Sequence, residues 1–406
     1  MAIAVSATGI TITGAGISNY TYNGTATGVA DILPIPTTVF VNGSFAEGSV
    51  DGHSFGYDAF KTIQEGINAV DVNGIVNIAV GTYDEQVVIN KSLTLQGAGD
   101  TTIIKPSSAD KLTQHLGILW AGGTKQITGI IIANEVASVT IKNLKVDGET
   151  VTTLPTGANW VAGIFLRETG GTIDSVGATN MTVGTTGTGV RGYGLYLYAA
   201  GASPVSVEVK NSTILNYDKN GINAQGNKLT ANIHDNTVTG RSSLPEGDEV
   251  QNGILVIDNA VGTVNNNTIS NNAYAPAAWG ATGIAFINAG GTAQGNTLTN
   301  NQMGAAAQIM QGFGSGTSWT VSFIGNTVNA SGLAIPGISG LNGATYVSGV
   351  TLNVIMDGNQ LTGGPGDGIS IGDLENLGPA GSVVATIRNN NISNWQNGIH
   401  LISSVG

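Results

Sequence analysis

The sequence predicts an all-β solenoid, a fold in which short strands run around successive coils that stack along one axis. Two repeated patterns and the composition support this prediction. A glycine followed by a hydrophobic, a variable and a second hydrophobic residue recurs between residues 163 and 401, and an asparagine followed by a variable and a hydrophobic residue recurs between residues 236 and 392. Glycine is common, at 61 of 406 residues, whereas only 10% of the residues are charged. A repeat whose single units cannot bury their own apolar face is typical of stacked coils.

The asparagine pattern sets the length of one coil. Its asparagines are separated by 31, 29, 30, 33 and 31 residues. Identical side chains at one place in neighbouring coils can stack, so we expect an amide ladder along the solenoid. The asparagines are Asn236, Asn267, Asn296, Asn326, Asn359 and Asn390.

The glycine pattern predicts which side chains form the core. Alternate residues of a strand face opposite sides, so the two hydrophobic residues after each glycine point to the same side, which we take as the interior. We expect the glycines to supply positive-φ corners. The first interior ladder is expected to contain Ile164, Leu195, Ile222, Ile254 and Ile284, and the second Leu166, Leu197, Ala224, Val256 and Phe286.

The N-terminal region differs from the repeats. Residues 57–70 carry a helical pattern, and we expect a helix there with Asp58 as its N-cap. Residues 1–36 are expected to form short leading strands and a linker, with the tail of a preceding domain as the alternative. The solenoid is expected over residues 37–406, with roughly eleven coils. The apolar residues of the helical pattern are Phe60, Ile63, Ile67 and Val70.

The charge and the missing cysteines exclude several classes of function. The chain has 14 Lys and Arg against 26 Asp and Glu, a formal charge of −12. Such a chain cannot easily build the basic face that nucleic acid needs, so we expect no nucleic-acid partner. No apolar run approaches the ~20 residues of a membrane span, so we expect no membrane insertion. With no cysteine, disulfides and thiolate metal sites are excluded. No signal peptide is visible at the start of the sequence.

Two segments resemble a known family. Residues 55–99, FGYDAFKTIQEGINAVDVNGIVNIAVGTYDEQVVINKSLTLQGAG, resemble the N-terminal cap of right-handed parallel β-helix proteins of the pectin-lyase-like superfamily, and the repeats over residues 163–401 resemble the coils of that family. The resemblance implies a right-handed parallel β-helix with an N-terminal capping α-helix. Residues 38–64 also resemble the start of β-helix modules in large bacterial surface and secreted proteins. Because the last repeat has no capping helix after it, we expect the rest of a larger polypeptide as a partner.

The resemblance does not select an activity, because the superfamily contains lyases, hydrolases, esterases, epimerases, phage tailspikes and inert adhesins. The stretch from Gly81 to Glu85 resembles the G-x-Y-x-E stretch of pectin methylesterases, but we expect Tyr83 and Glu85 to fix a turn. The R-x-P-x-x-R pattern of polysaccharide lyases is absent, as are the Asp pair and G-H-G of polygalacturonases.

One outer face is the candidate binding surface. Side chains that alternate with the interior ladders point outward, and neighbouring coils bring them within ~4.8 Å of one another. Aromatic rings beside amides and a guanidinium suit a sugar, so we expect a polysaccharide or cell-surface glycan as the ligand. The alternative is a face covered by a long loop, which the apolar continuation at Leu255, Ile257 and Ile287 favours. The candidates are Arg167, Glu168, Tyr196, Tyr198, Asn223 and Gln225.

A second cluster is expected to flank this face one coil further on. It contains His234 and Asp235 as candidate ligand-binding residues. In the acidic loop that follows, Glu246, Asp248 and Glu249 are candidate oxygen ligands for Ca²⁺, the one cofactor that the sequence suggests. The alternative for this loop is a solvated acidic segment.

Three functions remain open on the sequence. The first is an extracellular or cell-surface module that acts as an adhesin or structural spacer and binds glycans on one outer face. The second is a carbohydrate-active enzyme, a polysaccharide lyase or glycoside hydrolase that uses the same face. The third is a phage-type receptor-binding spike. The sequence therefore leaves open whether the protein is an enzyme.

Overall fold

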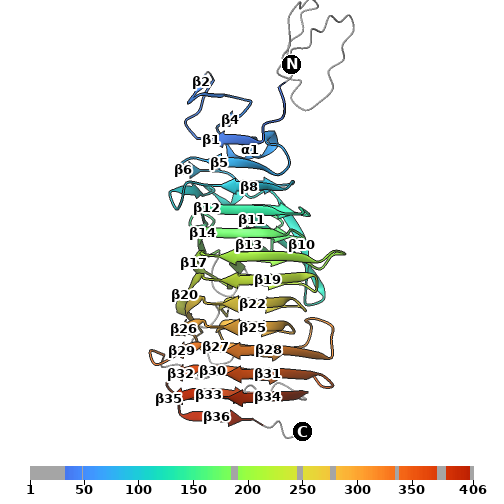
Figure 1. The fold of residues 1–406 in the computed structure, drawn as a ribbon, viewed down its shortest axis with the longest axis vertical. Helices are drawn as coiled ribbons and strands as arrows, with labels where there is room; N and C mark the ends of the chain where they lie inside the picture. Colours follow the sequence, from blue (N-terminus) through green and yellow to red (C-terminus); the bar gives the residue numbers. More distant parts are fainter. Residues whose placement is uncertain are drawn as a thin grey trace, which may run out of the picture.

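The computed structural model describes residues 33–47, 49–183, 191–244, 250–274, 280–333, 338–372 and 381–402. Strands of successive coils lie side by side in parallel and stack along one long axis, with the coils that come early and late in the chain at opposite ends (Figure 1). The predicted all-β parallel β-helix is therefore confirmed.

One long sheet has twelve strands, of which eleven are parallel and come from successive coils. The twelfth, β10, is antiparallel to its neighbour β11. In chain order the strands are β7 (Val87–Ile89), β10 (His115–Trp120), β11 (Gly123–Asn134), β13 (Trp160–Arg167), β15 (Arg191–Tyr198), β18 (Asn220–Gln225), β21 (Asn252–Ile257), β24 (Thr282–Ile287), β27 (Met303–Ile309), β30 (Ile338–Thr345), β33 (Gly366–Ile371) and β36 (Asn397–Leu401).

The other long sheet has 22 strands, because most coils contribute one strand on each side of a corner. Before the corner lie β16 (Val205–Lys210), β19 (Leu229–His234), β22 (Val261–Asn265), β25 (Gly290–Gln294), β28 (Ser318–Ile324), β31 (Thr351–Asp357) and β34 (Ser382–Arg388). After it lie β17 (Thr213–Tyr217), β20 (Thr237–Leu244), β23 (Thr268–Tyr274), β26 (Thr297–Thr299), β29 (Thr327–Asn329), β32 (Gln360–Thr362) and β35 (Asn391–Ser393). The first coils supply β1 (Thr38–Val41), β4 (Ala59–Phe60), β5 (Gly74–Ile78), β6 (Gly81–Tyr83), β8 (Leu93–Gln96), β9 (Thr102–Ile104), β12 (Val139–Asp147) and β14 (Gly171–Met181).

The strand register confirms both interior ladders. Ile164 pairs with Leu195, which pairs with Ile222, and the same row continues through the next two coils. The second row is in register in the same way, and the side chains of both rows are buried. The core is therefore one continuous apolar column inside the coils.

The predicted asparagine ladder is also confirmed. From Asn236 to Asn359, each asparagine Nδ2 donates to the Oδ1 of the asparagine on the next coil, for example from Asn267 to Asn296 at 3.0 Å. That same Oδ1 also accepts the backbone N–H of Asn267 at 2.9 Å. Because these side chains are buried from Asn236 to Asn359, the ladder satisfies backbone groups that water cannot reach.

The glycines of the glycine pattern do not form the expected positive-φ corners, although Gly295, Gly325 and Gly358 form three of them. The positive φ at each corner belongs to the residue just before the ladder asparagine, such as Asp235 (57°), Asn266 (55°) or Gly295 (66°). The repeat glycines are small for another reason. A Cβ on Gly253 would lie 2.6 Å from the carbonyl oxygen of Gly283 and 2.4 Å from a methyl group of Ile269.

The capping helix is shorter than the sequence predicts. Helix α1 runs from Ile63 to Ala69, and its N-cap is Thr62, not Asp58. Thr62 and Glu65 form a capping box. Asp58 instead accepts the backbone N–H of Ser54 at 2.7 Å.

Glu85, in the G-x-Y-x-E stretch, has a structural role. Its two carboxylate oxygens accept the backbone N–H groups of Ile63 and Gln64, at 2.8 and 3.0 Å, at the start of α1. Tyr83 is buried and donates to Ala79 O at 3.0 Å. Across the described ranges, no helix is long and apolar enough to span a membrane.

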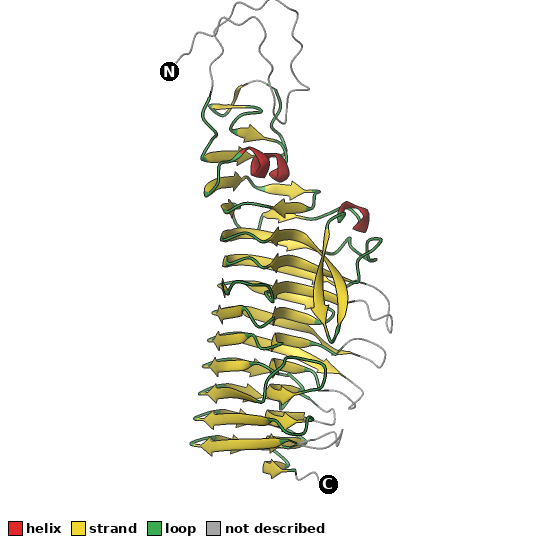
Figure 2. Cartoon of the chain, turned by 90° about the vertical axis from the view of Figure 1, so that its right-hand side faces the viewer, coloured by secondary structure: helices red, strands yellow, loops and turns green. Residues whose placement is uncertain are grey.

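A β-hairpin stands against the outer side of the twelve-stranded sheet (Figure 2). It consists of β10 and the first part of β11, joined by Ala121 and Gly122. Both of these residues have positive φ, 47° and 80°, as a type I′ hairpin turn requires. From Ile127 onward β11 belongs to the parallel sheet, so the hairpin is anchored in the coil that it leaves.

Candidate functional site

The structure brings the predicted outer-face residues together. Arg167 pairs with Tyr198, which pairs with Gln225, and Tyr196 pairs with Asn223 in the neighbouring row. The face is not open, however. The exposed fractions of Tyr196, Tyr198, Asn223 and Gln225 are 0%, 6%, 0% and 1%. The β10–β11 hairpin covers them, so the covered-face alternative describes this region.

Polar contacts hold the hairpin onto the sheet. The backbone N–H of Leu119 donates to the Tyr198 hydroxyl at 3.2 Å, and Gln225 Nε2 donates to Leu119 O at 2.8 Å. Arg167 Nε donates to Gly117 O at 3.0 Å, and its Nη1 pairs with Glu135 at 2.8 Å. Three of the side chains predicted to bind a ligand, those of Arg167, Tyr198 and Gln225, therefore bind the hairpin.

Glu168 does not join this group. Its carboxylate accepts the backbone N–H groups of Ala200 and Gly201, at 2.9 and 3.1 Å, in the turn after β15. It thereby fixes a turn beside the sheet.

An aromatic cluster fills the space between the hairpin and the sheet. Trp120, the last residue of β10, meets Trp160 edge-on at 5.1 Å. The guanidinium of Arg191 lies over both rings, 5.6 Å from Trp120 and 5.1 Å from Trp160. Cation–π contacts of this kind stabilise by about 0.5–2 kcal/mol. The cluster fixes the position of the hairpin tip.

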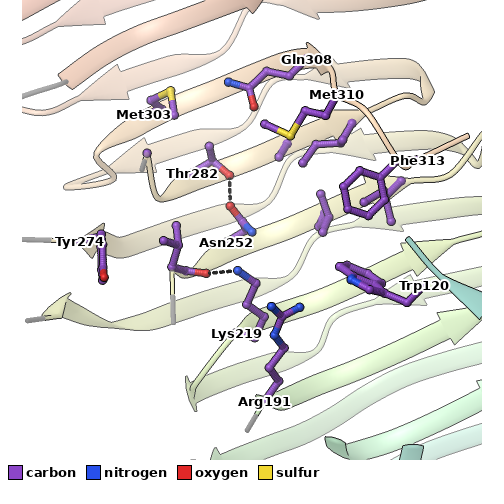
Figure 3. A pocket seen from close by; sticks show the side chains of 16 residues that line it. Trp120, Arg191, Lys219, Asn252, Tyr274, Thr282, Met303, Gln308, Met310 and Phe313 are labelled. Carbon is purple, nitrogen blue, oxygen red and sulfur yellow. Dashed lines mark hydrogen bonds between the residues drawn. The ribbon is translucent and has the colours of Figure 1, made fainter. Parts of the chain in front are cut away.

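Beside the hairpin tip lies a hollow of about 420 Å³, which we call the hairpin groove. Its floor is the outer side of β21 and β24, where the outward residues are aliphatic: Leu255, Ile257, Ala285 and Ile287. Figure 3 shows Trp120 and Phe313 on one side of the groove and Tyr274 on the other.

Polar side chains line the groove between these walls. Thr282 Oγ1 donates to Asn252 Oδ1 at 2.6 Å, and Gln308 Nε2 donates to Asn342 at 3.1 Å. Arg191 and Lys219 bring positive charge to the end near the hairpin (Figure 3). Lys219 Nζ donates to Val250 O at 2.8 Å. The described lining therefore combines aromatic and aliphatic surface with amides, a hydroxyl and two cations.

Asp258 lies at the edge of this site and connects its parts. One carboxylate oxygen accepts Gln225 Nε2 at 2.5 Å, and the other accepts the backbone N–H of Gly314 at 2.9 Å. Burial raises the pKa of Asp258 above its usual range, although both hydrogen bonds act in the opposite direction.

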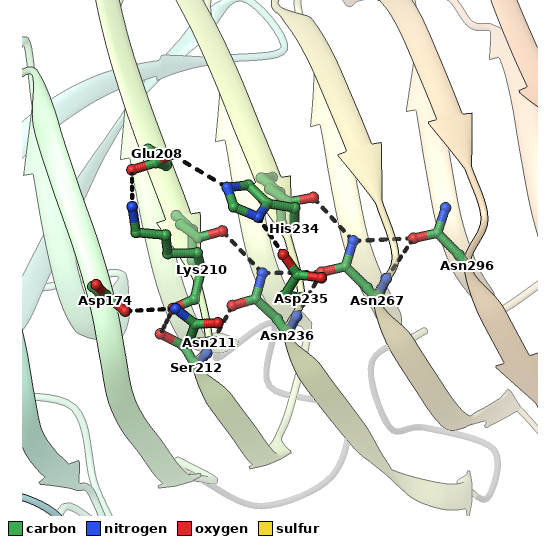
Figure 4. Close-up of polar contacts among 12 residues, drawn as sticks. Asp174, Glu208, Lys210, Asn211, Ser212, His234, Asp235, Asn236, Asn267 and Asn296 are labelled. Carbon is green, nitrogen blue, oxygen red and sulfur yellow. Dashed lines mark hydrogen bonds and ion pairs between the residues drawn. The ribbon is translucent and has the colours of Figure 1, made fainter.

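His234 does not flank this face, contrary to expectation. It is the last residue of β19, in the 22-stranded sheet, whereas the groove lies on the twelve-stranded sheet. His234 Nδ1 contacts Asp235 at 2.6 Å and Nε2 contacts Glu208 at 3.2 Å, and Glu208 in turn pairs with Lys210 at 2.7 Å (Figure 4). The hydrogen bond with Asp235 raises the pKa of His234.

The candidate calcium ligands Glu246, Asp248 and Glu249 lie outside the described residues. Arg241, just before them, pairs with Asp218 at 2.6 Å. In the described part of the chain, no group of three acidic or histidine side chains is placed to hold a metal ion.

The comparisons with known proteins agree with the fold. Residues 128–328 match the family model of the right handed beta helix region. This chain is a right-handed parallel β-helix protein. No curated protein sequence matches it.

Solved structures with a similar course of the chain have diverse roles. The A-module of a mannuronan C-5 epimerase from Azotobacter vinelandii is 16% identical, with a TM-score of 0.42, and the alignment covers 84% of this chain and 94% of that one. A surface protein and adhesin of Streptococcus pneumoniae is 12% identical, with a TM-score of 0.38 and coverages of 84% and 96%. An Acinetobacter phage tailspike is 10% identical, with a TM-score of 0.41 and coverages of 84% and 60%. No single activity follows from them.

Sequence reasoning missed the groove of this β-helix protein because Trp120 and Phe313 lie outside the repeats. A signal for the hairpin was present: the mostly apolar run Leu116–Trp120 leads into Gly122 and Gly123, and such a Gly-Gly pair is typical of a tight β-turn. No local pattern connects Phe313 with Trp120, since only the stacked coils bring them together.

Proposed function

We propose that this protein is a glycan-binding β-helix module and that the hairpin groove is its binding site. The observation that carries the proposal is the wall formed by Trp120 and Phe313 over an aliphatic floor, with Asn252, Thr282 and Gln308 in the same hollow. Aromatic rings with a few hydrogen-bonding groups, in a concave site, are the usual composition of a small-ligand pocket.

The chemistry of a sugar fits both parts of this lining. The C–H faces of a pyranose ring are apolar and pack on aromatic rings, whereas its hydroxyls donate and accept hydrogen bonds. The amide of Gln308 and the hydroxyl of Thr282 can do both. Arg191 and Lys219 are donors only, so they suit ring hydroxyls or an acidic substituent.

The predicted surface role is retained as part of this proposal. A rod of stacked coils that holds a glycan on one side suits an adhesin or spacer at the cell surface, and an extracellular location is where such glycans are met. Catalysis by a glycoside hydrolase needs two carboxyl groups at one sugar. The described groove lining supplies cations, amides and a hydroxyl, which favours binding.

The experiment is a binding screen of the purified chain against immobilised plant, algal and bacterial polysaccharides, with Ca²⁺ present. Each incubation is also assayed for new reducing ends, which both lyases and hydrolases produce. Saturable binding to a subset of glycans without new reducing ends supports the proposal. New reducing ends would identify an enzyme. Neither binding nor new reducing ends with any polysaccharide would overturn the proposal of glycan recognition.

A further inference from the structure

Resting on the proposed function, we infer that the hairpin groove binds the end of a glycan chain, two or three sugars long, and does not accept an internal segment of a polymer. The inference comes from what closes the groove along the axis of the β-helix. In an open cleft a polysaccharide would continue across neighbouring coils in both directions.

One long side of the groove is walled by a contact between two overhanging segments. The hairpin tip carries Trp120, and the loop after β27 carries Phe313. Their rings meet edge-on at 5.3 Å. Asn288 Nδ2 also donates to Phe313 O at 2.6 Å, which fixes this loop above β24. The two overhangs therefore join above the sheet.

Beneath this contact a second link supports the same wall. Gln225 Nε2 donates both to Leu119 O in the hairpin and to Asp258, and Asp258 accepts the backbone N–H of Gly314 in the loop. Beyond the link, the outward rings of Tyr196 and Tyr198 are buried under the hairpin. At the end of the groove toward β15 the hairpin therefore covers the sheet face, and Arg191, the first residue of β15, lies over the Trp120 ring and borders the groove.

The other end of the groove lies at β27. Met303 and Gln308 line the groove there, whereas Ser339 and Asn342, which pair with Met303 and Ala306 on the next coil, are fully buried. From the coil of β18 to that of β27 there are three strand spacings, or about 14 Å. A pyranose advances a glycan chain by roughly one strand spacing, so two or three sugars fill the groove.

The volume of the groove agrees with a ligand of two or three sugars. About 420 Å³ lies near the lower end of the range of small-ligand pockets, about 300–1,000 Å³. A site of this size with a closed end accepts a terminus, so its occupancy follows the number of chain ends. The occupancy of an open cleft would instead follow the total mass of sugar.

The test uses oligosaccharide ladders of two to eight sugars, made by partial hydrolysis of each polysaccharide in the panel, with the intact polymers as competitors. Calorimetric titration should show affinity per chain rising to two or three sugars and then staying constant. Intact polymer should compete in proportion to its chain ends, so mild fragmentation at constant sugar mass should increase competition. Affinity that keeps rising with length, or competition that follows sugar mass, would overturn the inference.

A variant separates closure from simple stacking. Trp120→Ala removes the ring that holds the hairpin tip against Trp160 and Arg191 at the closed end, so longer chains should gain affinity relative to trisaccharides, whatever happens to affinity overall. Leu119→Ala, at the solvent-facing hairpin tip, is the matched control and should keep the plateau. An unchanged plateau in Trp120→Ala would contradict closure by the hairpin. If no ladder binds to the wild-type chain, the proposed function fails and this inference fails with it, whereas a lost plateau overturns this inference alone.

Discussion

The ring of Trp120 meets the ring of Phe313 edge-on at 5.3 Å, although the two residues lie on segments far apart in the chain. Trp120 ends the first strand of the hairpin, and Phe313 lies in the loop that follows β27. The contact joins two overhangs across the outer face of a β-helix whose coils are otherwise regular. This interruption of the regular face creates the hairpin groove.

Removing the aromatic wall should weaken glycan binding. Trp120→Ala deletes the ring that stacks on the ligand and contacts Phe313, and aromatic contacts of this kind contribute about 0.5–1.5 kcal/mol beyond buried area. We expect a loss of about tenfold in affinity, which corresponds to about 1.4 kcal/mol. Calorimetric titration with the glycan found in the screen measures it. Leu119→Ala, the adjacent residue with 62% of its surface exposed, should bind like the wild type, and equal losses in the two variants would argue against a role for the Trp120 ring.

The asparagine ladder should be most sensitive in its middle. Asn296→Ala removes the Oδ1 that accepts both Nδ2 and the backbone N–H of Asn267, so the buried backbone N–H loses its partner and Nδ2 keeps only its bond to Ile233 O. We expect a loss of about 2–4 kcal/mol in the free energy of unfolding. Asn390→Ala, at the partly exposed end of the ladder, should cost less because water can replace the amide. Thermal unfolding followed by circular dichroism compares the two, and a larger loss for Asn390→Ala would contradict this account.

A repeat glycine should not tolerate a methyl group. Gly253→Ala places a Cβ against Gly283 O and Ile269, so the coils must move apart locally, at a cost of about 1–3 kcal/mol. Gly290→Ala is the matched control, because its nearest neighbour would be Thr320 O at 3.4 Å, an ordinary contact. Only the first substitution should lower the melting temperature. Similar melting temperatures for both variants would show that the close approach of the coils does not require glycine at position 253.

The acidic neighbours of His234 should make stability depend on pH. Because the hydrogen bond with Asp235 raises the pKa of His234 in the folded state, its contribution is fully present below the unfolded value of about 6.5 and is lost as the pH rises through the folded pKa. Glu208 carries the opposite shift, its pKa being lowered by Lys210 and then by His234, so its contribution is lost only in acid. Melting temperature should therefore fall as the pH rises above the unfolded pKa of about 6.5.

His234→Gln is the test of this assignment. The variant removes the titrating group, so the fall in melting temperature above about pH 6.5 should flatten. The loss of stability in acid, to which Glu208 contributes, should remain. Melting curves across the pH range compare the two proteins. A fall of equal size in His234→Gln would assign the pH dependence to other groups.

Much of the fold follows from the sequence because solenoid coils repeat. The interior rows that contain Ile222 and Ala224 are set by alternation along a strand, and the asparagine period sets the register of the coils. Alternation also places Tyr196 and Gln225 on the outside, which the structure confirms. Local pattern therefore determines the rod and the side of the sheet on which each residue lies.

The site could not be derived in the same way. Whether Tyr196 faces solvent depends on a hairpin from an earlier coil, and the hairpin's position depends on Arg191, Trp160 and Phe313, which are distant in sequence. The predicted start of the helix was wrong for a local reason, since Thr62 and Glu65 form the capping box and Asp58 does not cap the helix. The repeat glycines were assigned to corners because sequence alone does not show how closely the next coil approaches.

The most direct test of glycan binding in the hairpin groove is a crystal structure of the protein with a di- or trisaccharide found in the binding screen. A sugar ring should pack on Trp120 in the hairpin groove, with hydroxyls hydrogen-bonded to Asn252, Thr282 or Gln308 and with the glycan chain ending at the hairpin. Sugar bound at another surface, with the groove unoccupied, would contradict it.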